Sequence, residues 1–203
     1  MRVRVYVDGF NLYYGSLKGT SHKWLDLAAL TTALLPDDQI DAIRYFTAHV
    51  SGKQDPGAPL RQEAYLRALR TIPGLTLHFG RFLTEVRSMP VAPPAAGLVR
   101  VLKTEEKGSD VNLATYLLCD GFDGLYDLAV VVSNDSDLTE PIRVAKERFV
   151  LVGVYSPNPH HSYALAGVAS WYRHLPAVSV AAAQFPATVV TPDGRSVVRP
   201  AAW

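Results

Sequence analysis

The sequence predicts a three-layer α/β/α domain with a mostly parallel central sheet, and three observations support this fold class. First, residues 128–133 begin with five apolar residues in a row, which is typical of a strand buried on both faces. Second, predicted strands and helices alternate along most of the chain. Third, proline and glycine clusters separate those segments. The 203 residues suffice for one such domain with a small appendage.

The predicted elements follow the apolar periodicity and the turn residues. We predict strands at residues 2–8, 40–50, 75–82, 128–133, 149–155 and 170–174. We predict helices from Asn11, at 25–35 with Asp26 as N-cap, at 59–72, at 110–119 capped by Ser109, at 138–148 and at 162–169.

Residues 83–97 are the least regular part of the chain. Pro90, Pro93 and Pro94 exclude a central strand there, because proline cannot donate to the ladder of hydrogen bonds. We predict an exposed hairpin or flap, then an edge strand at 98–104 and a turn at 105–108. The domain organisation is therefore one domain at 1–175 with a Pro-rich flap or hairpin at 83–104. A C-terminal tail or peripheral hairpin follows at 176–203.

Composition excludes several functional classes. The formal net charge of +1 gives no general attraction to nucleic acid, although a local basic patch would suffice for binding. The single cysteine, Cys119, excludes an internal disulfide and a cysteine-based zinc site, and it suits a cytoplasmic protein. No apolar run approaches the ~20 residues of a membrane span, and the start has no signal-peptide pattern. We therefore expect a cytoplasmic protein without a membrane partner.

Four carboxylates occupy positions where predicted strands end or helices begin: Asp8, Asp110, Asp135 and Asp137. The carboxyl ends of parallel strands meet at one edge of a sheet, so these side chains are expected to converge in one cleft. A hard cation, Mg²⁺ or Mn²⁺, fits such a cluster. It would lower the pKa of a bound water and neutralise charge on phosphate oxygens. No glycine-rich nucleotide motif is present.

Each carboxylate also has a purely structural interpretation. Asp8 precedes Gly9 and can belong to a turn, and Asp110 can interact with a helix dipole. Asp135 and Asp137 can form an Asx-turn and an N-cap. Their joint placement at strand ends favours the functional interpretation.

Further candidates carry alternatives of the same kind. Lys103 and Lys107 can contact phosphate or remain solvated. Tyr13 and Tyr14 can stack on a base or pack in the core. The loop histidines His160 and His161 can act on a metal or a proton, but loop histidines are usually solvated.

Three blocks resemble the NYN domain (LabA-like) of the PIN-like nuclease superfamily, over about residues 1–175. They are 7–13 (VDGFNLY), 107–114 (KGSDVNLA) and 132–138 (VSNDSDL), in the order and spacing of that family. The resemblance implies a parallel α/β sheet, a divalent-metal acidic site and ribonuclease activity. By position, it implies metal-site roles for Asp8, Asp110, Asp135 and Asp137 and polar roles beside them for Asn11 and Ser133.

The sequence departs from the family pattern at two positions. Asn134 replaces a frequent glycine, and asparagine tolerates similar turn dihedrals. Tyr116 stands where many members carry a further acid, which weakens the expected metal site. Some relatives are associated with hydroxylation of pyridine compounds, but the sequence has no flavin, haem or 2-His-1-carboxylate signature.

The leading hypothesis is a divalent-metal-dependent endoribonuclease that hydrolyses RNA phosphodiester bonds at an acidic cleft. Its catalytic and metal-binding residues would be the four aspartates. Its substrate-binding residues would be Asn11, Ser133, Asn134, Lys103 and Lys107, with Arg81 as a further backbone contact. The alternative is a degenerate, non-catalytic PIN-like module that binds RNA or a protein partner. A third class, a small-molecule enzyme, would need a closed apolar pocket over the strand ends. The flap and the apolar tail could support a homodimer, or the tail could pack on its own domain.

Overall fold

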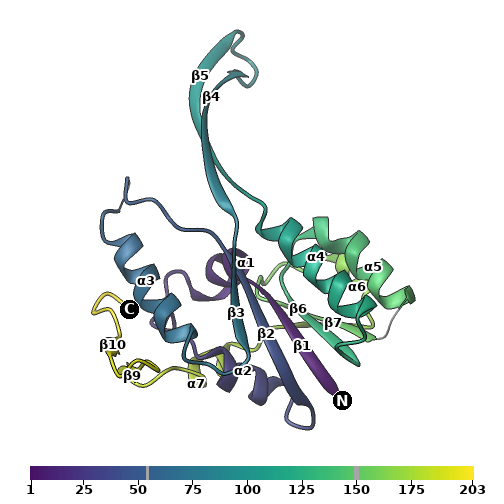
Figure 1. Ribbon diagram of the computed structural model, residues 1–203. Coiled ribbons are helices and arrows are strands. Elements are labelled where there is room, and N and C mark those ends of the chain that lie inside the picture. The colour runs from purple at the N-terminus through teal and green to yellow at the C-terminus, as the bar shows by residue number, and fades with distance from the viewer. Residues whose placement is uncertain (54, 149–150) are drawn as a thin grey trace.

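The computed structural model describes residues 1–203 except 54, 149 and 150. A sheet lies between two layers of helices, and a long hairpin projects from this body (Figure 1). The strands of the body sheet are β1 (Arg2–Asp8), β2 (Gln39–Thr47), β3 (Leu75–Phe79), β6 (Leu128–Val132), β7 (Leu151–Ser156) and β8 (Trp171–His174). They run in the order β3-β2-β1-β6-β7-β8, and every neighbouring pair is parallel. The predicted fold class is therefore confirmed.

The helices connect these strands and cover both faces of the sheet. One layer contains α2 (Leu27–Leu34), α3 (Ala58–Leu69) and α7 (Ala177–Ala182), and the other contains α4 (Ser109–Phe122), α5 (Thr139–Arg148) and α6 (Tyr163–Val168) (Figure 1). Shorter turns follow β1 and β6: α1 (Gly9–Leu12) continues into the π-helix η1 (Tyr13–Leu17), and the 3₁₀-helix η2 (Ser136–Leu138) precedes α5. Asp26 caps α2 as predicted, accepting hydrogen bonds from the amides of Ala28 and Ala29.

Alternate residues of the central strands bury side chains in two separate cores. In β6, Leu128, Val130 and Val132 belong to the core beneath α2 and α3, whereas Ala129 and Val131 belong to the core beneath α4 and α5. All five are buried, because a parallel strand covered by helices has no solvent-exposed face. This confirms the prediction made from the uninterrupted apolar run.

The projecting arm corrects three predictions. The expected strand 75–82 ends at Phe79, and β4 (Arg81–Pro90) begins after Gly80. Gly80 has no room for a side chain, because a Cβ there would lie 2.7 Å from the carbonyl oxygen of Lys107. The expected edge strand 98–104 is instead β5 (Leu98–Lys107), which pairs only with β4 in a separate antiparallel sheet. The expected turn at 105–108 is part of that strand up to Lys107.

Two other boundaries differ from expectation. The N-cap of α4 is Gly108 at φ +98°, and Ser109 is the first helical residue, so the predicted serine cap is wrong. The Ser109 hydroxyl donates instead to the carboxylate of Glu106, at the base of the arm. The strand predicted from residue 149 is described from Leu151, since residues 149 and 150 lie outside the described part.

The C-terminal segment packs against the body. After α7, the short strands β9 (Thr188–Val190) and β10 (Ser196–Val198) form an antiparallel pair. Phe185, Val189 and Val197 are buried in the core beneath α2 and α3, and the indole of Trp24 donates to the carbonyl of Pro186. None of the helices within the described residues combines the length and apolar character that a membrane-crossing segment needs.

Candidate metal centre

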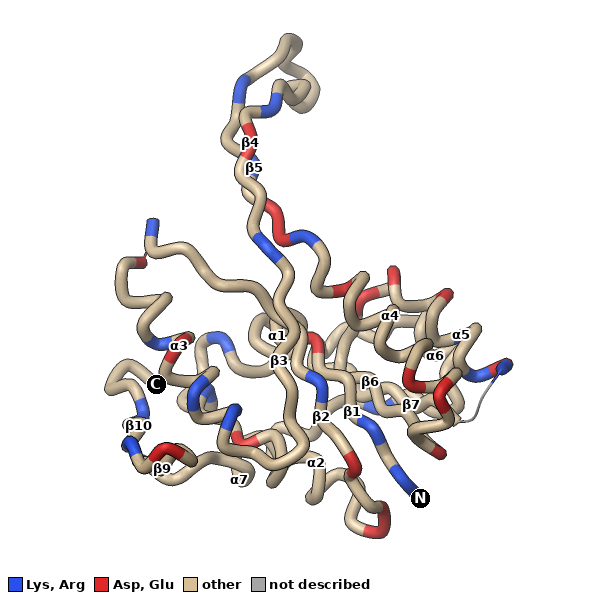
Figure 2. Tube along the Cα trace, in the orientation of Figure 1, with Lys and Arg blue, Asp and Glu red and all other residues tan. Residues whose placement is uncertain are grey.

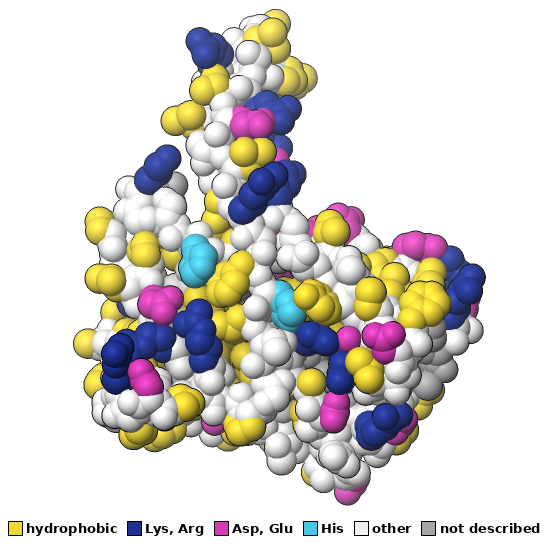
Figure 3. Space-filling view, in the orientation of Figure 1, with side chains coloured by type: hydrophobic (Ala, Val, Ile, Leu, Met, Phe, Trp, Pro, Cys, Tyr) yellow, Lys and Arg dark blue, Asp and Glu magenta, His cyan; other side chains and the backbone are white. Residues whose placement is uncertain are grey.

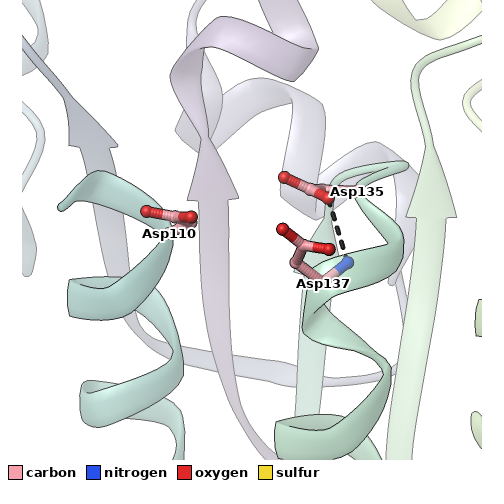
Figure 4. A group of neighbouring side chains, drawn as sticks. All are labelled: Asp110, Asp135 and Asp137. Carbon is pink, nitrogen blue, oxygen red and sulfur yellow. Dashed lines mark hydrogen bonds between the residues drawn. The ribbon is translucent and has the colours of Figure 1, made fainter. Parts of the chain in front are cut away.

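Three carboxylates meet at the edge of the sheet where the parallel strands end. Asp110 lies in the first turn of α4, Asp135 in the loop after β6, and Asp137 in η2. One carboxylate oxygen of each lies within 4.8 Å of the others. Figure 4 shows Asp110 facing Asp135 and Asp137 across the gap between the two helical segments. The topology brings them together because β6 and the start of α4 both lie beside the end of β1.

Asp135 has a structural role within this group as well. One of its oxygens accepts from the backbone amide of Asp137 at 3.0 Å, which caps η2 and shapes the loop (Figure 4). A carboxylate has several lone pairs, so the cap leaves acceptor capacity free. The structural interpretation and the functional one are therefore compatible at this residue.

Asp8 lies beside this group but is not one of its three members. Its carboxylate is buried and accepts from the Asn11 amide, the Asn11 side chain and the Ser133 hydroxyl at 2.7–3.0 Å. Burial raises the pKa of Asp8 above its usual value. The hydrogen bonds oppose this shift, whereas the charge of Asp135 adds to it. Asp8 therefore forms the buried side of the acidic region.

Ser133 joins Asp8 to the loop that carries the other acids. Its hydroxyl is fully buried, donates to Asp8 at 3.0 Å and accepts from the amide of Asp135 at 3.1 Å. Asn11 makes a second connection, since its side-chain oxygen accepts from the amide of Asn134 at 3.3 Å. The end of β1 and the end of β6 are thus held in one hydrogen-bonded unit.

The side chain of Asn134 faces the neighbouring loop. Its oxygen accepts from the hydroxyls of Ser156 and Tyr172, and its amide group donates to the carbonyl of His160. These contacts tie the loop after β6 to the strands β7 and β8. Asn134 therefore positions the backbone that carries Asp135.

The three-carboxylate group fits a divalent cation. Within the described residues, no Lys or Arg side chain forms an ion pair with these acids or with Asp8. Carboxylates this close repel one another unless a cation or proton joins them. Oxygen ligands of this kind suit Mg²⁺ or Mn²⁺.

The predicted phosphate-binding lysines lie outside this group, on the arm. Lys103 and Lys107 both pair with Glu105, and Arg81 lies opposite Lys107 in the arm's register. Lys107 immediately precedes Gly108 and α4, so it is near Asp110 in sequence. His160 is exposed, and the His161 ring contacts Tyr163 and Tyr172, so both remain in the loop after β7.

Tyr116 and Asp120 project toward other parts of the sheet. The Tyr116 ring contacts His78 at 4.1 Å and lies under the guanidinium of Arg44 at 4.5 Å. Asp120 is buried and pairs with both Arg4 and Arg44. Burial opposes ionisation, but hydrogen bonds from Arg44, Tyr6 and Arg4 lower the pKa of Asp120. Asp120 is thus neutralised by arginines, unlike the acids of the metal centre.

Sequence reasoning did not find this arginine cluster. Arg4 and Arg44 each lie between apolar residues of a central strand, and a charge at such a position is the signal that calls for a buried partner. The partner itself, 76 residues from Arg44, could be assigned only from the fold.

Comparison with known proteins defines the class. The NYN domain profile matches residues 2–175, and the chain belongs to this family, within the PIN-like superfamily. The LabA-like subtype stays a prediction.

One relative is similar over the full length of this chain. It is the 6-hydroxy-3-succinoylpyridine 3-monooxygenase HspA of Pseudomonas putida (strain DSM 28022 / S16). The two are 34% identical over an alignment 242 residues long, which covers 100% of this chain and 75% of HspA. A crystal structure of a protein of unknown function from Vibrio parahaemolyticus has a similar fold, with a TM-score of 0.57 and 17% identity. The match covers 86% of this chain and 93% of that one.

Proposed function

We propose that this protein is a divalent-metal-dependent endoribonuclease that hydrolyses RNA phosphodiester bonds. The observation that carries the proposal is the convergence of Asp110, Asp135 and Asp137 within 4.8 Å, with no cationic side chain paired to them in the described residues. Membership of the NYN family supports the same chemistry. An unneutralised acid cluster at the carboxyl ends of parallel strands is suited to a cation and an anionic substrate.

In this proposal, Asp110, Asp135 and Asp137 hold Mg²⁺ or Mn²⁺, and Asp8 completes the acidic set from its buried side. When bound, such an ion polarises a phosphate oxygen and lowers the pKa of a coordinated water. Ser133 fixes the position of Asp8 and Asp135 through its two hydrogen bonds.

The remaining predicted residues would act on the substrate or on the loop. Asn11 and Asn134 orient the ends of β1 and β6 around the phosphate. Lys103, Lys107 and Arg81 lie on the arm above α4 and would contact the RNA backbone, where Lys103 and Lys107 would exchange their exposed ion pairs with Glu105 for phosphate contacts.

Cleavage of a fluorescent RNA in Mg²⁺ or Mn²⁺, and its loss in chelator, tests the proposal. The decisive variant is Asp135→Asn, because asparagine preserves the N-cap and removes only the charge. The matched control is Asp37→Asn, an exposed aspartate in the turn before β2. We expect cleavage in wild type and the control and at least a 100-fold loss in Asp135→Asn. Cleavage that survives both chelator and Asp135→Asn would refute the metal mechanism. RNA binding without any cleavage would identify the non-catalytic module instead.

A second candidate function is ring hydroxylation, and the full-length similarity to a 6-hydroxy-3-succinoylpyridine monooxygenase favours it. A monooxygenase inserts one atom of O₂ into a C–H bond and reduces the other to water with two electrons from a reductant. Oxygen consumption with 6-hydroxynicotinate and NADH, measured beside the RNA assay, separates the two functions. Substrate-dependent oxygen uptake without RNA cleavage would favour the hydroxylase.

The nuclease proposal implies RNA as partner and Mg²⁺ or Mn²⁺ as cofactor. We also propose a cytoplasmic protein, on the basis of its single cysteine, and association with a second copy of the chain. Fluorescence microscopy of a tagged chain tests the location.

A further inference from the structure

A second candidate site lies on the other side of the β1–α1 turn from the acids. It is a cavity of about 260 Å³ between η1 and α3. Six of its sixteen lining residues are aromatic, and they come from distant parts of the sequence: Phe10, Tyr13, Tyr14, Tyr45, Tyr65 and Trp203. Gly9 also lines the cavity, and the residue before it, Asp8, belongs to the acidic region. These aromatic side chains can stack on a planar ring.

The cavity contains an uncommitted hydroxyl. Tyr45 is 6% exposed, and its hydroxyl lies so close to Gly9 that an added Cβ would be 2.6 Å away. Within the described residues this hydroxyl has no hydrogen-bond partner, whereas the Tyr65 hydroxyl donates to the carbonyl of Leu25. Tyr45 lines the cavity, so its free hydroxyl can hydrogen-bond to a bound ligand.

The cavity also carries an excess positive charge. Arg61 and Asp55 line it and pair with each other. Lys23 lines it too, and in the described part of the chain its ammonium group pairs with no carboxylate. An anion on the ligand would therefore find a cation that is already partly buried.

We propose that this cavity binds a planar aromatic or heteroaromatic ring that carries an anionic group. The ring stacks among the tyrosines, the Tyr45 hydroxyl contacts a ring substituent, and Lys23 contacts the anion. The volume is at the small end for ligand sites, which favours a single ring with a short substituent. Two sources share this chemistry: a pyrimidine nucleotide, which suits the nuclease, and an aromatic acid, which suits the hydroxylase.

Calorimetric titration of the full chain in chelator tests the site independently of catalysis. The probes are 5′-UMP and 6-hydroxynicotinate, with 3-hydroxypyridine as a ring without the anion and succinate as an anion without the ring. We expect at least one ring anion to bind 10-fold more tightly than both partial probes. Which of the two it is identifies the source.

Variants assign the binding to this cavity. Lys23→Gln should weaken the ring anion at least 10-fold, and Tyr45→Phe should weaken it several-fold. Lys53→Gln, an exposed lysine outside the cavity, should leave binding unchanged. The proposal is overturned if neither ring anion outperforms its partial probes, or if Lys23→Gln and Lys53→Gln bind alike. Because no metal is present, a failure of RNA cleavage has no bearing on this result.

The arm formed by β4 and β5 carries an independent second inference. Its register gives two different faces, since residues paired across the strands share a face. One face contains both signs of charge, with Glu85 opposite Lys103. The other is nearly uncharged from residue 84 to 90, and it pairs Thr84 with Thr104, Val86 with Leu102, Ser88 with Arg100 and Pro90 with Leu98.

This nearly uncharged face is exposed. Leu98 and Leu102 are 74% and 75% exposed, and apolar side chains are visible along the arm in Figure 3. A two-stranded hairpin is only marginally stable in water unless something packs against it. An exposed apolar face of this kind marks an interaction surface.

We infer that this face binds the same face of a second copy of the chain. A nucleic acid would require cations, but Arg100 is the only one on this face among residues 84–90 and 98–104. Basic and acidic residues alternate along the arm in Figure 2, and on the other face Arg87 pairs with Glu85. A face with a single cation, Arg100, among apolar and hydroxyl side chains can pack against a copy of itself, which a two-fold dimer requires.

The size of the face predicts a weak dimer. Residues 84–90 make this face about 23 Å long, at ~3.3 Å for each of seven residues. Two strands make it about 10 Å wide. This area is less than half of the ~800 Å² per partner that stable complexes bury. We therefore expect a concentration-dependent dimer that dissociates in the micromolar range.

Sedimentation velocity between about 1 and 100 μM, without metal or RNA, tests the dimer. We expect a shift from one to two chain masses in wild type and a monomer at all concentrations for Leu102→Glu. Val178→Glu, at an exposed apolar residue of α7, is the matched control and should still dimerise. Circular dichroism verifies the fold of both variants. A wild-type monomer at every concentration, or a Leu102→Glu variant that dimerises like wild type, overturns the inference.

Discussion

Asp137→Asn provides the most direct physical test of the acidic cluster, because it is expected to stabilise the protein in the absence of metal. Asp137 is exposed, and an oxygen of its carboxylate lies within 4.8 Å of oxygens of Asp110 and Asp135. At that distance each pair of like charges costs about 0.9 kcal/mol in water. Asp137 also gains about 0.5 kcal/mol from the start of a helix, which the variant loses.

Salt screening reduces each repulsion to about 0.5 kcal/mol, so the net gain should be about 0.5 kcal/mol. For a chain of this length, such a gain raises the melting temperature by about 1–2 °C. When a divalent metal is added, Asp137→Asn should become less stable than wild type. An ion at 100 times its dissociation constant stabilises the folded protein by about 2.7 kcal/mol, which corresponds to about 5–10 °C. Asp137→Asn should lose most of this stabilisation.

Thermal unfolding in EDTA and in Mn²⁺, followed by circular dichroism, measures both effects. Asp37→Asn removes the same charge from the turn before β2 and should leave the melting temperature unchanged both in EDTA and in Mn²⁺. The reasoning is refuted if Asp137→Asn melts below wild type in EDTA. It is also refuted if Mn²⁺ raises the melting temperature of both proteins equally.

Three further predictions concern the surrounding structure. Ser133→Ala removes the hydroxyl shared by Asp8 and Asp135 and should weaken Mn²⁺ binding about 10- to 100-fold by calorimetry. Gly9→Ala places a Cβ 2.6 Å from Tyr45 and should lower the free energy of unfolding in urea by about 1–3 kcal/mol. Asp120→Asn leaves the half-buried Arg44 without its carboxylate and Arg4 with Asp41 alone, and should cost about 3 kcal/mol. Because the pKa of Asp120 is lowered by folding, its contribution is present above about pH 4 and lost as pH falls below its folded pKa. Asp120→Asn should therefore lose less stability than wild type in urea titrations between about pH 4 and pH 2.

The parts of the fold that local pattern determines were predictable from sequence. The uninterrupted apolar run of β6 requires burial on both faces, and that requirement already implies a parallel sheet between helices. The rule that strand ends converge then brings Asp110 and Asp135 to one edge without any knowledge of the strand order. The helix before Pro36 and its cap at Asp26 follow from the same local chemistry.

Other features depend on contacts between distant segments. The prolines near residue 90 predicted a hairpin. Composition also suggested a turn at Glu105 and Glu106, but these residues pair with Leu83 and Phe82 and belong to β5. A ladder of hydrogen bonds across two strands outweighs the weak turn preference of one of them. The aromatic cavity could not be foreseen either, because Tyr13, Tyr65 and Trp203 meet only in the folded chain.

The turn from Asp8 to Gly9 connects the two candidate sites. On one side, the Asp8 carboxylate accepts from Asn11 and Ser133 and faces the charge of Asp135. On the other, Gly9 lines the aromatic cavity against Tyr45, whose pKa is raised by burial and by the negative charge of Asp8. A ring held in that cavity would therefore lie beside the residues that carry the acids. A ring bound there and a cation bound among the carboxylates would be coupled through Asp8, so occupancy of either site should change affinity at the other.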